Sequence, residues 1–207
     1  MSALSHLAQP HVTLANASVV IPQLLVGGDL SADPATAAAQ LAELVSLGVT
    51  HIADVRIEWS DERLVAAYPP GIRYLHAGID DIGETVPAAW FTATVGWVLE
   101  ALLDPAAVVL AHCHMGINRG PSLGVAVLLA QGWDVIDAMS AIREARPIAA
   151  MAYAEDALGW HHDRRGASPV ERLIDQVRVA RWRQEHPLDV VRLIREQRSG
   201  ELNCLSA

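Results

Sequence analysis

The apolar positions of the chain fall into runs separated by polar turns, and four of these runs have the composition of β-strands. Residues 18–27, 49–55, 72–76 and 108–111 are rich in valine, isoleucine and leucine. Such runs, bounded by glycine, proline or charged residues, are typical of buried strands. The pattern therefore predicts strands spread over the first 111 residues.

Between the predicted strands, apolar residues recur every three or four positions, which is the spacing of an amphipathic helix. Asp33 and Pro34 supply an N-cap and a first-turn proline for a helix that ends at Gly48. Further helices are predicted over residues 87–103 and 121–131. Alternating strands and helices indicate an α/β fold, in which a central, mainly parallel or mixed sheet is flanked by helices.

Length and composition favour one domain with an appendage. The chain has 207 residues, of which 52% are hydrophobic, and can bury a substantial core. We expect an N-terminal arm over residues 1–17, a main domain over 18–165 and a helical extension with a tail over 166–207. The extension opens with a capping box at Ser168 and Glu171. It is expected to pack on the main domain or to form a homodimer, and substrate docking is the alternative.

Charge and cysteine usage narrow the class of protein. The net charge is −9, and the part up to residue 167 holds 18 acidic residues against 8 arginines. This balance repels nucleic acid and disfavours polyanionic inositol lipids. No apolar run is long enough to span a membrane, so we expect no membrane partner. Two cysteines are too few for a disulfide scaffold, and we expect a cytoplasmic protein in a reducing compartment.

Residues 112–122 read His-Cys-His-Met-Gly-Ile-Asn-Arg-Gly-Pro-Ser and carry the chemistry of the chain. They lie between the predicted strand 108–111 and the predicted helix 121–131. A loop that curls into a helix N-terminus offers main-chain N–H groups to a phosphate. We expect Cys113 to be a thiolate there, because amides, the helix N-terminus and a guanidinium favour the anion. Arg119 can grip two phosphoryl oxygens, and Gly116 lets the backbone approach closely.

These residues resemble the cysteine-based protein tyrosine phosphatases, and among them the compact dual-specificity phosphatases. The similarity covers roughly residues 18 to 163, including the segment from Trp133 to Pro147, which looks like the helix and Arg-Pro turn after the family's phosphate loop. The resemblance implies that Asp81, 32 residues before Cys113, is the general acid. Asp80 is the competing candidate, because adjacent carboxylates cannot be distinguished by charge.

The resemblance also assigns roles within the loop. His112 would organise it through hydrogen bonds, without a metal ion, and no cofactor is expected. The phosphate-binding residues of the loop would be His114, Met115, Gly116, Ile117, Asn118 and Arg119. Their amides would face the phosphate, and their side chains would form the rim and walls of the pocket. Gly120 departs from the family, which usually has serine or threonine there to ease departure of the thiolate. Ser122 is the substitute candidate for that hydroxyl.

The predicted function is hydrolysis of a phosphate monoester through a phosphocysteine intermediate, with a phosphoprotein or a small phosphate ester as substrate. Phosphotyrosine, phosphoserine and phosphothreonine all remain open. One alternative is a weakly active phosphate-binding module of the pseudophosphatase kind. Gly120 favours this alternative, because it lacks the hydroxyl that eases departure of the thiolate. A second alternative is a phosphatase that acts on a phosphoinositide or an RNA 5′-phosphate. A third is thiol chemistry such as arsenate reduction, but this activity would leave the spacing between Asp81 and Cys113 unexplained.

Overall fold

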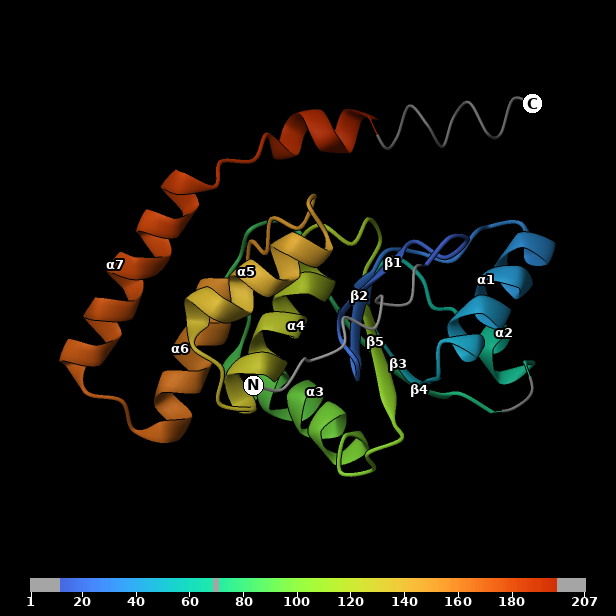
Figure 1. Ribbon diagram of the computed structural model, residues 1–207, viewed down its shortest axis with the longest axis horizontal. Coiled ribbons are helices and arrows are strands. Elements are labelled where there is room, and N and C mark those ends of the chain that lie inside the picture. Colours follow the sequence, from blue (N-terminus) through green and yellow to red (C-terminus); the bar gives the residue numbers. More distant parts are fainter. Residues whose placement is uncertain (1–11, 69–70, 197–207) are drawn as a thin grey trace, which may run out of the picture.

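A five-stranded sheet lies between two layers of helices in the computed structural model, which describes residues 12–68 and 71–196 (Figure 1). The strands are β1 (Ala17–Ile21), β2 (Leu24–Gly27), β3 (Val49–Arg56), β4 (Arg73–Ile79) and β5 (Val108–His112). Their order across the sheet is β1-β2-β5-β3-β4, and only the β1–β2 pair is antiparallel. The predicted α/β fold with a mainly parallel sheet is confirmed.

Helices cover both faces of this sheet. They are α1 (Pro34–Ser46), α2 (Glu62–Ala66), α3 (Ala88–Ala101), α4 (Arg119–Ala130), α5 (Val135–Ala145), α6 (Ala154–Arg165) and α7 (Pro169–Glu185). Figure 1 shows α1 and α2 on one face and α3 to α6 on the other, with α7 along the outer edge of α5 and α6. Within the main domain, α4 is the most enclosed helix, and all its residues from Arg119 to Leu129 are buried.

Two element boundaries differ from the prediction. The run 18–27 forms two strands, because Pro22 and Gln23 make a turn that folds β2 back antiparallel to β1. Proline has no N–H to donate to a strand ladder, so a break there is physically reasonable. The helix predicted from residue 121 begins at Arg119 instead, so the phosphate loop opens directly into α4.

The C-terminal extension packs on the main domain through a narrow contact. The predicted capping box is confirmed, since the Glu171 N–H donates to the Ser168 hydroxyl and the Ser168 N–H donates to the Glu171 carboxylate. Within α7, only Val179 and Trp182 are buried, and Trp182 donates its indole N–H to Ser140 of α5. The other apolar residues of the helix, a stripe of Val170, Leu173, Ile174 and Val177, face outward and are 53–66% exposed. Homodimerisation through this extension stays a prediction.

Candidate functional site

The phosphate loop connects the middle strand of the sheet to its most buried helix. β5 ends at His112 and α4 begins at Arg119, so residues 113–118 form the turn between them. The Cys113 N–H donates to the Gly27 carbonyl at the end of neighbouring β2, at 3.1 Å. The carboxyl ends of the parallel strands meet at this edge, where α/β proteins commonly bind their ligands.

The carbonyl groups of the loop point outward, toward the body of the protein. Four successive carbonyls accept hydrogen bonds from outside the loop: His114 from the Asp29 N–H, Met115 and Gly116 from the Arg146 guanidinium, and Ile117 from the Ala150 and Met151 N–H groups. In a trans peptide the following N–H points the opposite way. The amides of the loop therefore face inward and form a cradle for an anion.

Gly116 is required where the loop turns. Its φ is +64°, and a Cβ atom there would lie 2.6 Å from the Gly27 carbonyl carbon and 2.5 Å from Nη2 of Arg146. Both conditions exclude a side chain. The buried Arg146 guanidinium occupies this space and holds the loop from behind.

Arg119 is held by a carboxylate that the sequence did not single out. Its Nη1 and Nη2 donate to the two carboxylate oxygens of Glu58 at 2.8 and 2.7 Å, and Nη1 also donates to the Ile79 carbonyl. The buried Nε has no hydrogen-bond partner among the described residues and lies 3.7 Å from Oδ2 of Asp81. The Nε–Nη2 edge of the guanidinium is thus left to receive two oxygens of a phosphoryl group.

The pKa of Cys113 is set by effects that oppose one another. Its sulfur is buried, and this burial raises the pKa of the thiol above the ordinary value. The amides of Gly120 and Gly116 and the charge of Arg119 act in the opposite direction, while Asp81 adds to the rise. Burial thus works against the expected thiolate, which stays a prediction. Glu58 pairs with Arg119, so its negative charge offsets part of the guanidinium charge beside the thiol.

This arrangement predicts that Glu58→Gln lowers the pKa of Cys113. Glu58 is ionised at neutral pH, because the hydrogen bonds from Arg119 lower its pKa to about 2. Its removal leaves the guanidinium charge free to stabilise the thiolate, so alkylation by iodoacetamide should shift to lower pH. Glu62→Gln, at an exposed position of α2, should leave the alkylation profile unchanged. An unshifted profile for Glu58→Gln would show that Glu58 does not control the thiol.

Asp81 is turned toward the loop and its neighbour is not. The hydroxyl of Tyr153 donates to Oδ1 of Asp81 at 2.9 Å, and Nδ2 of Asn118 lies 3.3 Å from both oxygens. Asp80 contributes only its backbone carbonyl to this network, as an acceptor from Tyr153 at 3.3 Å. The geometry favours Asp81 over Asp80 as the proton donor, since its carboxylate also lies beside Arg119.

These groups meet in one cavity of about 250 Å³. It is lined by Cys113 and Arg119 at its base and by Glu58, Asp80, Asp81, Ile82, His114, Met115, Ile117, Asn118 and Ile194 around them. All the loop residues predicted to form the pocket line this cavity, except Gly116. Ile194 is notable, because it comes from the C-terminal extension.

The predicted supporting residues lie behind the cradle. His112 is buried, and burial lowers its pKa to about 4, so the ring is neutral at physiological pH. Ser122 accepts a hydrogen bond from the Tyr153 N–H at 3.1 Å. A Cβ atom on Gly120 would lie 3.0 Å from the Ala111 carbonyl oxygen. Close packing of α4 on β5 thus accounts for glycine at this position.

A cluster of possible metal ligands beneath the loop is already neutralised by an arginine. Asp54, Asp61 and His112 are near enough to one another to share an ion. However, the fully buried guanidinium of Arg56 already bridges both carboxylates, at 2.6 Å from Asp54 and 2.5 Å from Asp61. This cation meets the charge requirement of the cluster.

Four lining or orienting residues escaped the sequence-based prediction, namely Glu58, Ile82, Tyr153 and Ile194. Glu58 could have been predicted as a site residue, because it follows β3 at the same sheet edge as the loop. Tyr153 and Ile194 could not, since each reaches the site only through the packing of later helices.

Comparison with known proteins supports the resemblance. No family model matches the chain. It is 27% identical over 139 residues to mouse dual specificity protein phosphatase 13B, which covers 66% of this chain and 67% of that protein. A mouse putative dual specificity phosphatase complexed with zinc tungstate superposes with a TM-score of 0.61 at 19% identity, over 79% of this chain and 98% of that one. PTPMT1 in complex with PI(5)P gives 0.58 at 16% identity, over 72% and 96%.

The sequence match and the shared fold agree with each other. The resemblance to compact dual-specificity phosphatases of the cysteine-based tyrosine phosphatase superfamily is confirmed. Within the described ranges, no helix is both long and apolar enough to cross a membrane.

Proposed function

We propose that this chain is a cysteine-dependent phosphatase that hydrolyses phosphate monoesters through a phosphocysteine intermediate. One observation carries the proposal: Cys113, the free edge of Arg119 and the carboxylate of Asp81 border the same cavity, above a cradle of inward amides. Nucleophile, anion clamp and proton donor are the groups that a two-step phosphoryl transfer requires.

In the first step the Cys113 thiolate attacks phosphorus, and the bond from phosphorus to the ester oxygen breaks. Asp81, protonated, donates its proton to the leaving oxygen, while Arg119 and the amides hold the three remaining phosphoryl oxygens. In the second step Asp81 takes a proton from water, the water oxygen bonds to phosphorus, and the phosphorus–sulfur bond breaks. Inorganic phosphate and the thiolate are the products.

The surroundings of the cavity favour a phosphoprotein or a small ester with a single phosphate. The carboxylates of Glu58 and Asp81 lie at it, and Arg119 is the only arginine among the described residues that line it. A second phosphate group would meet these carboxylates at short range, which costs free energy. The complex of PTPMT1 with PI(5)P shows what a similar fold can bind, yet the charges here disfavour a polyanionic lipid or an RNA 5′-phosphate.

Rapid-mixing kinetics on p-nitrophenyl phosphate test this function. We expect a burst of nitrophenol close to one equivalent of enzyme, followed by slower turnover, because Gly120 offers no hydroxyl to the departing thiolate. Acid quenching during the burst should trap a phosphoenzyme. Release of nitrophenol without any phosphoenzyme would contradict the covalent route.

The weakly active phosphate-binding module is the second candidate, favoured by Gly120 and by the raised pKa of the Cys113 thiol. The same experiment separates the two functions. Tight binding of a phosphopeptide with no nitrophenol and no phosphate released would establish the binding module and exclude the phosphatase.

A further inference from the structure

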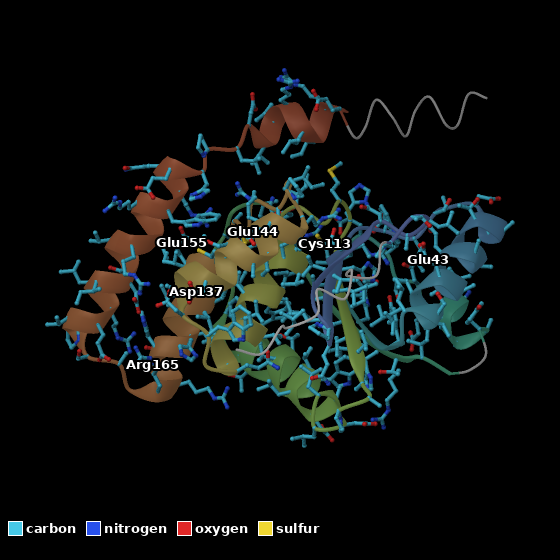
Figure 2. The ribbon with its side chains drawn as sticks, viewed as in Figure 1. Glu43, Cys113, Asp137, Glu144, Glu155 and Arg165 are labelled. Atoms are coloured by element: carbon cyan, nitrogen blue, oxygen red, sulfur yellow. The ribbon has the colours of Figure 1, made fainter. Side chains whose placement is uncertain are left out.

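The C-terminal extension is fastened to the segment that supports the phosphate loop. Arg183, near the end of α7, donates to both carboxylate oxygens of Glu155 at 2.6 Å and to the carbonyls of Ala150 and Met151 at 3.0 and 2.9 Å. The N–H groups of Ala150 and Met151 in turn donate to the Ile117 carbonyl of the loop. The position of α7 is thereby tied to that of the cradle. Figure 2 labels Glu155 at this junction.

The last turn of α7 is fixed by further contacts. The ring of His186 stacks on Trp182, with centroids 4.6 Å apart, and the guanidinium of Arg143 lies 5.1 Å from the Trp182 ring centroid. Arg143 also donates to the His186 carbonyl at 3.3 Å. These contacts set the direction in which the chain leaves the helix.

Beyond this point residues 190–196 form a short helix that crosses above the main domain (Figure 1). Asp189 begins it by accepting a hydrogen bond from the Arg192 N–H at 2.9 Å. Val190, Leu193 and Ile194 are half-buried, whereas Val191 is 59% exposed. The spacing of the half-buried residues is that of one helix face. Cys113 lies below this helix in the view of Figure 2, and Ile194 lines the same cavity as its sulfur.

Ile194 adds an apolar side chain to the lining of the cavity. Together with Ile82, Met115 and Ile117, it forms the apolar part of the lining, beside the polar Asn118 and His114. The carboxylates that the described structure places beside Arg119 there are those of Glu58 and Asp81. A substrate that fits both features has one phosphate and an apolar, uncharged group next to the ester oxygen.

We propose that Ile194 is a specificity-determining residue, which makes the extension a wall of the substrate pocket and selects aryl phosphate monoesters, such as phosphotyrosine, over alkyl or multiply charged ones. This inference rests on the proposed phosphatase function. Arg183 is the positioning residue of the wall, because it holds α7 to the Ala150–Met151 segment.

The selectivity of Ile194→Ala tests the proposal. The measured quantity is the ratio of kcat/KM for 2-naphthyl phosphate to kcat/KM for phenyl phosphate, since the larger ring has more apolar surface to place against the wall. Loss of three carbons from an apolar wall should lower this ratio about fivefold to tenfold, mainly through KM of the naphthyl ester. Val191→Ala, on the exposed side of the same helix, should keep the wild-type ratio.

The anchor gives an independent variant. Arg183→Ala should lower the same ratio, whereas Arg181→Ala should not, because Arg181 contacts only Glu185 one turn further along α7 in the described structure. An unchanged ratio in Ile194→Ala would overturn the proposal while the wild type still hydrolyses both esters. Absence of hydrolysis of either ester by the wild type would instead overturn the phosphatase function itself.

Discussion

Replacement of Cys113 by serine is expected to lower the rate of p-nitrophenyl phosphate hydrolysis by a factor on the order of 10⁴ or more. A serine hydroxyl has nearly the shape of the thiol, but it stays protonated where even the raised pKa of Cys113 allows some thiolate. The cradle, Arg119 and Asp81 remain in place in this variant. The loss therefore reports the nucleophile rather than the binding site.

The control for this variant is Cys204→Ser, which removes the other cysteine of the chain and lies outside the described residues. It should keep wild-type turnover. Binding of inorganic phosphate to Cys113→Ser, followed by calorimetry, should persist with an affinity similar to that of the wild type, since amides and Arg119 make the contacts. Retained hydrolysis in Cys113→Ser would remove the basis of the phosphocysteine mechanism.

The phosphate loop was predictable from sequence, because the residues that identify it are close together in the chain. Cys113, Gly116 and Arg119 lie within seven residues, between an apolar run and a helix. Gly116 in particular is dictated by a backbone turn with φ of +64°, which sequence reasoning recognised as a close approach. The fold followed in the same way from alternating strands and helices.

The parts that were not predictable depend on contacts between distant segments. Glu58 meets Arg119 across 61 positions of sequence, and Tyr153 meets Asp81 across 72. The rise in the pKa of Cys113 depends on such contacts too, since burial of the sulfur and the nearby charge of Asp81 are properties of the folded chain. A motif shows which groups are present but not which charges are already compensated.

Replacement of Asp81 by asparagine should lower kcat/KM, which reports formation of the phosphocysteine, by about 10² to 10⁴ for esters with poor leaving groups. Asparagine keeps the size of the side chain and can still accept a hydrogen bond from Tyr153, but it cannot give a proton to the leaving oxygen. The loss should therefore shrink as the leaving group becomes more acidic. Measurements of kcat/KM over a series of substituted phenyl phosphates would show this as a steeper dependence on leaving-group pKa. The matched control is Asp80→Asn, which removes the neighbouring carboxylate and should leave that dependence unchanged.

The network around Asp81 makes the same test more specific. Tyr153→Phe removes the hydroxyl that donates to Oδ1 of Asp81 and contacts the Asp80 carbonyl, while the buried ring is kept. If this hydroxyl orients the acid, the variant should lose about tenfold in kcat/KM for poor leaving groups and little for good ones, since a single hydrogen bond is at stake. Combined with Asp81→Asn, it should add no further loss, because the proton that it helps to position is already absent. An equal loss across all leaving groups would indicate instead that the hydroxyl supports this segment through the hydrogen bond that it accepts from the Gly83 N–H, and that Asp81 is oriented by Asn118 alone.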